Sequence, residues 1–117
     1  MGNLRAVAMF PRIPAENLGT FKRVANEMLT EIKKLDSILR YDLFFSENEA
    51  SCVVLEEYSS ANGVFEHVER HSHFLNQLKL LGGEIEGSMF PMGDSDVALE
   101  TIRSTWDSKM HTHFGGK

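Results

Sequence analysis

Three histidines and one tyrosine stand in the segment from Cys52 to Phe74, CVVLEEYSSANGVFEHVERHSHF. His67 can act as a general base that removes a proton from a bound molecule, because the unperturbed pKa of imidazole lies near neutrality. Tyr58 can orient a hydroxyl group of that molecule or stack on its ring. A helix rich in histidines and aromatics, directly after an apolar strand, is typical of the wall of a small-molecule pocket.

Each of these side chains also has an ordinary structural interpretation. His67 stands at the edge of an apolar stripe, where a histidine often bonds a backbone carbonyl instead of a ligand. Tyr58 can pack its ring in the core and keep its hydroxyl in water. His67 and His71 are four residues apart, a spacing that lets two imidazoles share a metal ion, but no third ligand stands at a telling distance along the sequence. We therefore expect no metal site.

The composition narrows the class of protein. A chain of 117 residues, 42% hydrophobic and 25% charged, suits one globular domain with one core. Its net charge of -5 argues against a nucleic-acid partner. Neither a membrane-spanning apolar run nor the pattern of a signal peptide is present in the sequence. The single cysteine, Cys52, stands in an apolar run and is expected to be buried and reduced, which fits a cytoplasmic protein.

Strands are expected over residues 4–10, 38–45, 52–58 and 85–90. The first carries apolar residues on both of its faces, the second alternates in hydrophobicity, and the third begins with four consecutive apolar residues. A polar connection over 46–51 has the length of a hairpin loop. The residues of the second strand that are expected to share one face are Leu39, Tyr41, Leu43 and Phe45.

Two long helices are expected between these strands. Apolar residues recur at steps of three and four over 18–35, which predicts a first helix of about six turns. Ser59 or Ser60 is expected to cap the second helix, whose apolar stripe breaks near 71–73. Gly82 and its neighbouring glycine are expected to end that helix.

A short third helix and an irregular tail are expected at the end of the chain. Asp94 or Ser95 suits the N-cap of this helix. The tail over 107–117 shows no hydrophobic period. The residues of the third helix that are expected on one side are Leu99, Ile102 and Trp106.

This order of elements predicts a ferredoxin-like βαββαβ sandwich of the α+β class, with one antiparallel sheet, two helices on one face and an extra C-terminal helix. A single domain is expected over 1–117, with a core at about 4–90 and an extension over 91–117. Two helices can cover one face of the sheet, yet the run from Cys52 to Leu55 is apolar on both faces. Burying roughly 500 Å² of that second face would contribute on the order of 12 kcal/mol before entropy is subtracted. We therefore expect a homodimer.

The segments described above resemble the antibiotic biosynthesis monooxygenase family of the dimeric α/β-barrel superfamily. The resemblance spans about 4–90 and implies a homodimer whose two sheets pack face to face as a barrel. It also implies a cavity between the sheet and the helices of each subunit. Tryptophan is common in the family at the position of Tyr58, which weakens a haem-degrading role. The residues that match the family pattern are Leu55, Glu56, Glu57 and Tyr58 at the strand end, His67 in the helix, and the later pair His73 and Phe74.

The resemblance also implies an activity. Family members include oxygenases that use neither metal nor flavin, because a deprotonated phenol, anthrone or quinol can pass an electron directly to O₂ in a dry pocket. We therefore expect a cofactor-independent monooxygenase acting on a small aromatic substrate and O₂, in which His67 assists proton removal and Tyr58 positions the ring. A non-catalytic dimeric barrel that binds a small molecule or serves in stress remains open, as does haem degradation. The residues expected to line the cavity are Tyr41, His71 and Phe74.

Overall fold

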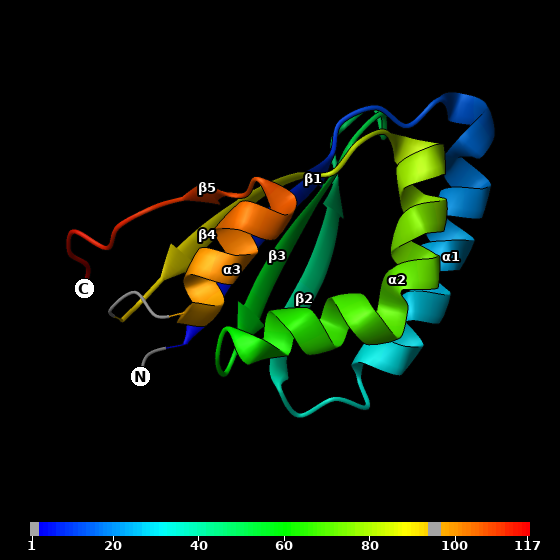
Figure 1. Cartoon of the computed structure of the whole chain (residues 1–117). Helices are drawn as coiled ribbons and strands as arrows, with labels where there is room; N and C mark the ends of the chain where they lie inside the picture. Colours follow the sequence, from blue (N-terminus) through cyan, green and yellow to red (C-terminus); the bar gives the residue numbers. More distant parts are fainter. Residues whose placement is uncertain (1–2, 94–96) are drawn as a thin grey trace.

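A five-stranded sheet carries the helices on one of its faces (Figure 1). The computed structural model describes residues 3–93 and 97–117. The spatial order is β2-β3-β1-β4-β5, and all neighbouring pairs are antiparallel except β4 with β5. The ferredoxin-like α+β arrangement expected from the sequence is confirmed. The elements are β1 (Leu4–Phe10), η1 (Ala15–Asn17), α1 (Leu18–Ile32), β2 (Ile38–Phe45), β3 (Cys52–Tyr58), α2 (Asn62–Gly82), β4 (Glu86–Pro91), α3 (Val97–Trp106) and β5 (Lys109–Met110).

The first helix is shorter than the apolar stripe predicts. Pro14 precedes a 3₁₀ turn, so the α-helical part begins at Leu18. It ends at Ile32 after 15 residues, because the chain tightens there and the Leu35 N–H bonds the Ile32 carbonyl three residues back. The stripe continues through Leu35, but this residue lies in a turn.

The second helix confirms two predictions and corrects one. Its backbone leaves helical geometry at His71, with φ -116° and ψ 15°, within the predicted break. Gly82 is its last residue, and the following glycine adopts a φ of 92°, a conformation that favours glycine. The predicted serine cap is wrong. Ala61 holds the N-cap position, and the carbonyl of Ser60 already accepts from the Gly63 N–H.

A β-bulge corrects the predicted faces of β2. The register with β3 shifts between Ile38 and Arg40, so that Leu39 is 52% exposed and Ile38 packs on the core. The expectation that Leu39 shares a face with Tyr41 is therefore wrong. The bulge moves one residue out of the alternation, and the rest of the strand keeps its predicted faces.

The C-terminal segment contains more structure than the sequence suggests. Lys109 and Met110 form β5, which pairs in parallel with β4, whereas no element was expected in the tail. Buried Leu99 and Ile102 place α3 against the same face of the sheet as α2. The predicted caps of α3, Asp94 and Ser95, lie outside the described residues.

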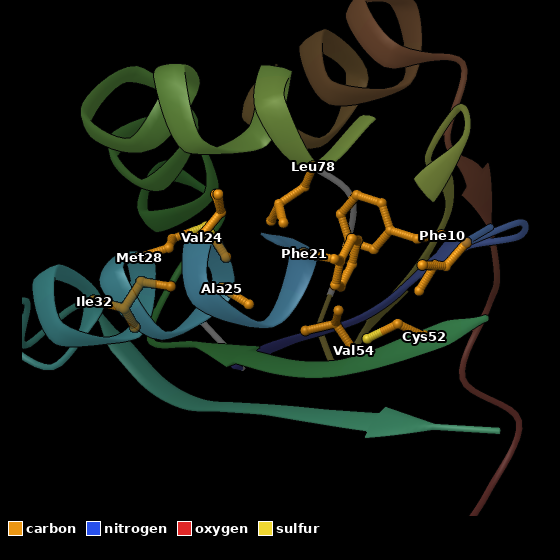
Figure 2. Close-up of a cluster of buried hydrophobic side chains, with 10 residues drawn as sticks. Phe10, Phe21, Val24, Ala25, Met28, Ile32, Cys52, Val54 and Leu78 are labelled. Atoms are coloured by element: carbon orange, nitrogen blue, oxygen red, sulfur yellow. The ribbon is translucent and has the colours of Figure 1, made fainter. Parts of the chain in front are cut away.

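The main core lies where α1 and α2 cross one half of the sheet (Figure 2). Phe10, Phe21 and Leu78 meet there above Cys52 and Val54 of β3. The buried position expected for Cys52 is confirmed, with 0% of its surface exposed.

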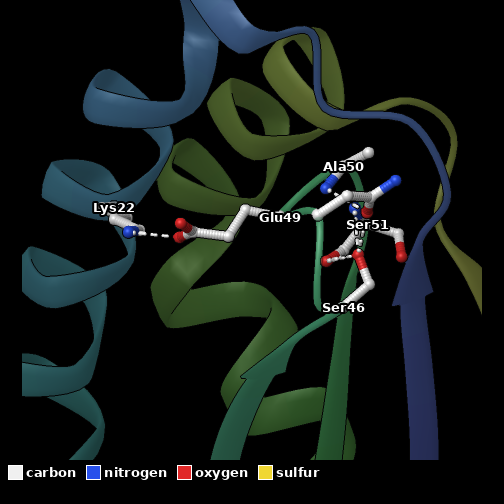
Figure 3. Close-up of polar contacts among 6 residues, drawn as sticks. Lys22, Ser46, Glu49, Ala50 and Ser51 are labelled. Atoms are coloured by element: carbon white, nitrogen blue, oxygen red, sulfur yellow. Dashed lines mark hydrogen bonds and ion pairs between the residues drawn. The ribbon is translucent and has the colours of Figure 1, made fainter.

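The hairpin between β2 and β3 is tied to the first helix (Figure 3). Within the loop, the Ser46 N–H bonds the Ser51 carbonyl, and the Ser51 N–H bonds the Ser46 hydroxyl. Glu49 forms an ion pair with Lys22 of α1. The polar connection therefore also fixes the sheet edge against the helix layer. Among the residues described, no helix is long and apolar enough to cross a membrane.

Candidate functional site

A cavity of about 310 Å³ lies between the sheet and α2. Its floor is made of small side chains, because Ala8 of β1 pairs with Gly87 of β4, and both line the cavity. Ala6, two residues before Ala8, lines it as well. Where larger residues would fill the space under α2, alanine and glycine leave it open. Its volume is near the lower end of the roughly 300–1,000 Å³ typical of small-molecule sites.

Four paired residues form a row across the sheet beneath this cavity. Tyr41 of β2 pairs with Glu56 of β3, which pairs with Ala6 of β1, which pairs with Met89 of β4. All four side chains line the cavity. Because residues two apart in a strand share a face, Glu56 and Tyr58 both point toward the helices. The register therefore brings a carboxyl group and two phenols to one wall.

Among the titratable groups of this wall, the carboxyl group of Glu56 has the pKa nearest neutrality. The Tyr58 hydroxyl donates a hydrogen bond to its carboxylate. Burial raises the pKa of Glu56 from 4.5 to about 7, and the bond from Tyr58 opposes part of this shift. Near neutral pH the carboxyl group is therefore present in both protonation states. Such a group can accept a proton from a ligand and return it.

His67 enters the wall from α2 with 3% of its surface exposed. Its Nδ1 atom lies 2.7 Å from Nδ1 of His71, and its Nε2 atom lies 3.2 Å from the Tyr41 hydroxyl oxygen. Burial, followed by the effect of His71, lowers the pKa of His67 to about 3. His67 is therefore neutral and hydrogen-bonded through both ring nitrogens, which makes it a weak base.

The structure brings three of the five predicted site residues to the cavity. Tyr41, Tyr58 and His67 line it. His71 and Phe74 line instead a second depression, between α1 and α2, although His71 contacts His67 directly. The two depressions lie on different sides of α2.

Glu56 is not among the site residues predicted from the sequence. The signal was available, because the alternation in β3 places this carboxyl on the same face as Val54 and Tyr58. An acidic residue on the inward face of a strand needs a partner or a function. Glu56 was recognised only as part of a motif at the end of the strand.

The site shows no arrangement of metal ligands. Across residues 3–93 and 97–117, no group of three or more histidine, cysteine, aspartate or glutamate side chains could hold an ion. His67 and His71 turn ring nitrogens toward each other. The groups present can bind, orient and exchange protons with a ligand.

Comparisons with known proteins define the class of fold. No family model matches the chain, and no curated protein does. Among solved structures, MupZ from Pseudomonas fluorescens superimposes with a TM-score of 0.82 at 16% identity, covering 100% of this chain and 94% of that one. A candidate antibiotic biosynthesis monooxygenase from Caulobacter crescentus gives 0.69 at 20% identity, over 80% of this chain and 92% of that one. Another, from Nitrosomonas europaea, gives 0.69 at 14% identity, over 78% and 91%. The chain has the fold of the antibiotic biosynthesis monooxygenases.

Proposed function

We propose that the protein is a monooxygenase that uses no cofactor and oxidises a small aromatic compound of the quinol type. The observation that carries this proposal is Glu56, a carboxyl group with a pKa of about 7 in the wall of a cavity lined largely by apolar and aromatic residues. Electron transfer from a phenol to O₂ requires the phenolate. The protein must therefore supply a proton acceptor beside a binding site that excludes water. The shared fold supports the same class of activity.

The proposed reaction balances without a further reactant. Glu56 accepts the hydroxyl proton of a hydroquinone, and the anion passes an electron to O₂. The two radicals combine into a peroxide at the neighbouring ring carbon, and Glu56 returns the proton to it. Loss of the hydrogen on that carbon and cleavage of the O–O bond give a hydroxyquinone and water. One oxygen atom enters the product, and the other leaves as water.

Each neighbouring side chain has a role in this scheme. Tyr58 holds the Glu56 carboxylate through its hydroxyl group. His67 holds the Tyr41 hydroxyl in place. The small floor residues Ala8 and Gly87 leave room for a flat ring above the sheet. His67 thus positions a phenol of the wall, while proton removal falls to Glu56 instead.

We further propose that two copies associate through the outer face of the sheet. The support is a block of apolar side chains opposite the helices, in which Phe44 pairs with Val53, Val53 with Met9, and Leu55 with Val7. Leu55 is 40% exposed and Phe44 is 55% exposed, which is unusual for large apolar residues grouped on one face. A second copy of the same face is a partner of matching chemistry.

Light scattering tests this association. The Leu55→Glu variant is expected to be a monomer at micromolar concentration, because it places a charge within the apolar block, directly beside Val7. Leu80→Glu is the matched control, since Leu80 is 87% exposed on α2, away from this face. A wild-type monomer would refute the proposed dimer.

Oxygen uptake with a panel of hydroquinones and anthrones tests the activity. Uptake coupled to formation of the hydroxylated quinone, one O₂ per product, is the expected result. Binding of panel compounds without any oxygen consumption would contradict the oxygenase and favour a non-catalytic binding protein. A shift of the Soret band on addition of haem would instead favour haem chemistry.

A further inference from the structure

Three hydrogen-bonded side chains connect the cavity with the second depression, the groove between α1 and α2. Tyr41 and His67 line the cavity. His71 lines the groove between α1 and α2, together with Glu31 and His73. The links are the 3.2 Å contact between the Tyr41 hydroxyl and Nε2 of His67 and the 2.7 Å contact between the two Nδ1 atoms. A continuous path of exchangeable protons therefore runs through the helix layer.

The break in α2 falls at one member of this path. His71 is the residue whose backbone leaves helical geometry. The centroid of its ring lies 4.9 Å from the ring centroid of His67, which lies 5.0 Å from the ring centroid of Tyr41. A departure from helical geometry inside a helix is a frequent mark of function. Here it coincides with the point at which the path reaches the groove.

The path can carry hydrogen bonds in two directions. In one arrangement the Tyr41 hydroxyl donates to His67, whose Nδ1–H donates to His71. In the other, His71 donates to His67, whose Nε2–H donates to Tyr41. Both arrangements leave all three groups uncharged, because each imidazole carries one proton. A proton that enters at one end releases a different proton at the other end and converts one arrangement into the other.

The surroundings favour passage of a proton over its retention. Burial lowers the pKa of His67 to about 3 and raises the pKa of Tyr41 well above 10.0, so neither the imidazolium nor the tyrosinate accumulates. Burial also lowers the pKa of His71. The charged and titratable groups that face the path are Cys52, Glu56 and Tyr58 from β3, Glu27, Glu31 and Lys34 from α1, and Arg70 and His73 from α2.

We propose that Tyr41, His67 and His71 form a proton relay between the ligand cavity and solvent in the groove between α1 and α2. This relay goes beyond the proposed oxygenase, since any ligand that gains or loses a proton in the cavity would use it. In the proposed reaction, Glu56 returns the proton that it takes from the substrate, so the relay serves the molecules in which Glu56 is already protonated when the ligand binds. Because Glu56 is the cross-strand neighbour of Tyr41, the relay would let it lose that proton while the ligand closes the cavity. The exit for protons is then separate from the entrance for substrate.

Nitrogen-15 NMR of the histidine side chains in the full chain, without ligand, tests the relay directly. We expect His67 to be neutral between pH 6 and pH 8, with a scalar coupling between its Nδ1 atom and Nδ1 of His71 across the N–H···N hydrogen bond. A charged His67 at pH 6, or no coupling, would overturn the proposal. This measurement does not depend on any enzymatic activity, so its failure and that of the oxygenase are distinguishable.

The exchange of the His67 ring proton with water separates a relay from a purely structural histidine pair. His71→Asn is expected to slow this exchange at least tenfold, because it removes the exit to the groove. A structural pair would exchange through local opening, and the same variant would leave the rate unchanged or raise it. His113→Asn, in the exposed C-terminal tail and outside both the cavity and the groove, is the control and should match wild type. If His71→Asn does not fold, the wild-type exchange rate in low concentrations of urea decides. Exchange through the relay should not change with urea, whereas exchange through local opening should speed up and would overturn the proposal.

Discussion

The two halves of the helix-facing side of the sheet differ in what their strands present to the helices. In one half, the Phe21 ring contacts Phe10 and Phe45 edge-on, with centroids 5.2 and 5.9 Å apart, and is fully buried. In the other half, β1 and β4 present the small residues Ala6 and Gly87 to the helices, and a cavity results. We call the half around Phe21 the packed half and the half with the cavity the open half.

This difference shows how one fold carries both a core and a site. Backbone pairing is continuous through β1, since its residues pair with β3 in one unbroken register. The size of the side chains alone decides whether the space above a strand is filled. Polar groups then gather where the space is open, because Glu56 and His67 can be hydrogen-bonded there without disturbing the packed half.

The open half is expected to carry all the chemistry, so its carboxyl group should give the largest effect. Glu56→Gln keeps the size of the side chain and its acceptor for Tyr58 but removes the proton acceptor. We expect kcat/KM for a hydroquinone to fall about a hundredfold, the lower range for a lost general base. Steady-state oxygen consumption measures it.

Glu69→Gln provides the control for this loss, because Glu69 is an exposed carboxyl on α2. Equal activity of the Glu56→Gln variant and wild type would remove Glu56 from the reaction. Equal losses in both variants would point to a general effect of charge.

The packed half was largely predictable from the sequence. Periods of two and of three to four mark its strands and helices, and burial of Phe21 and Met28 follows from their place in the stripe. Two features escaped this reasoning for physical reasons. The bulge at Leu39 depends on how β2 meets β3, and β5 forms because β4 offers it an edge, so neither is written in local periodicity.

The open half was predictable only in part. Tyr41, Tyr58 and His67 were expected at the cavity and do line it. Glu56 was missed as a base because its pKa depends on burial under α2, a tertiary property. His71 was expected at the cavity but reaches the groove, since the direction of its ring depends on the break in the helix.

Two glycines allow the comparison to be tested by adding one methyl group to each half. At Gly82, a Cβ atom would lie 2.8 Å from the Phe21 ring and 3.2 Å from Cβ of Phe10. At Gly87, it would meet the Ser108 hydroxyl at 3.5 Å, an ordinary contact. We expect Gly82→Ala to lower the free energy of unfolding by about 2 kcal/mol, the usual cost of overpacking, and Gly87→Ala to change it by less than about 0.5 kcal/mol. Urea denaturation measures both.

One outcome of the glycine comparison would contradict the difference between the two halves. Equal effects of Gly82→Ala and Gly87→Ala would mean that the two halves are packed alike and that the cavity closes in solution. Ligand binding by the Gly87→Ala variant gives a second check, since the added methyl group takes space from the cavity floor.

The last effect expected concerns how the stability of the protein depends on pH. Glu56 has a pKa of about 7 in the folded protein against 4.5 as the ordinary value, so between these values the folded state binds more protons than the unfolded state. Stability from this group is therefore fully present below pH 4.5 and is lost as the pH rises toward 7. Glu56→Gln removes this loss and should make the protein more stable than wild type at pH 8. We expect a gain of about 2 kcal/mol, less than the full pKa shift would give, because Glu56 is partly exposed and water screens its charge in part.

The contribution of His67 has the opposite sign and cancels in this comparison. Its lowered pKa gives stability that is present above pH 6.5 and is lost as the pH falls toward 3, equally in wild type and in the variant. Urea denaturation at pH 4 and pH 8 therefore isolates Glu56. The variant should gain stability over wild type at pH 8 and little or none at pH 4. An equal difference at both pH values would mean that the carboxyl group is as well hydrated as one on the surface, and that the cavity wall lacks the dry environment on which proton removal from a phenol depends.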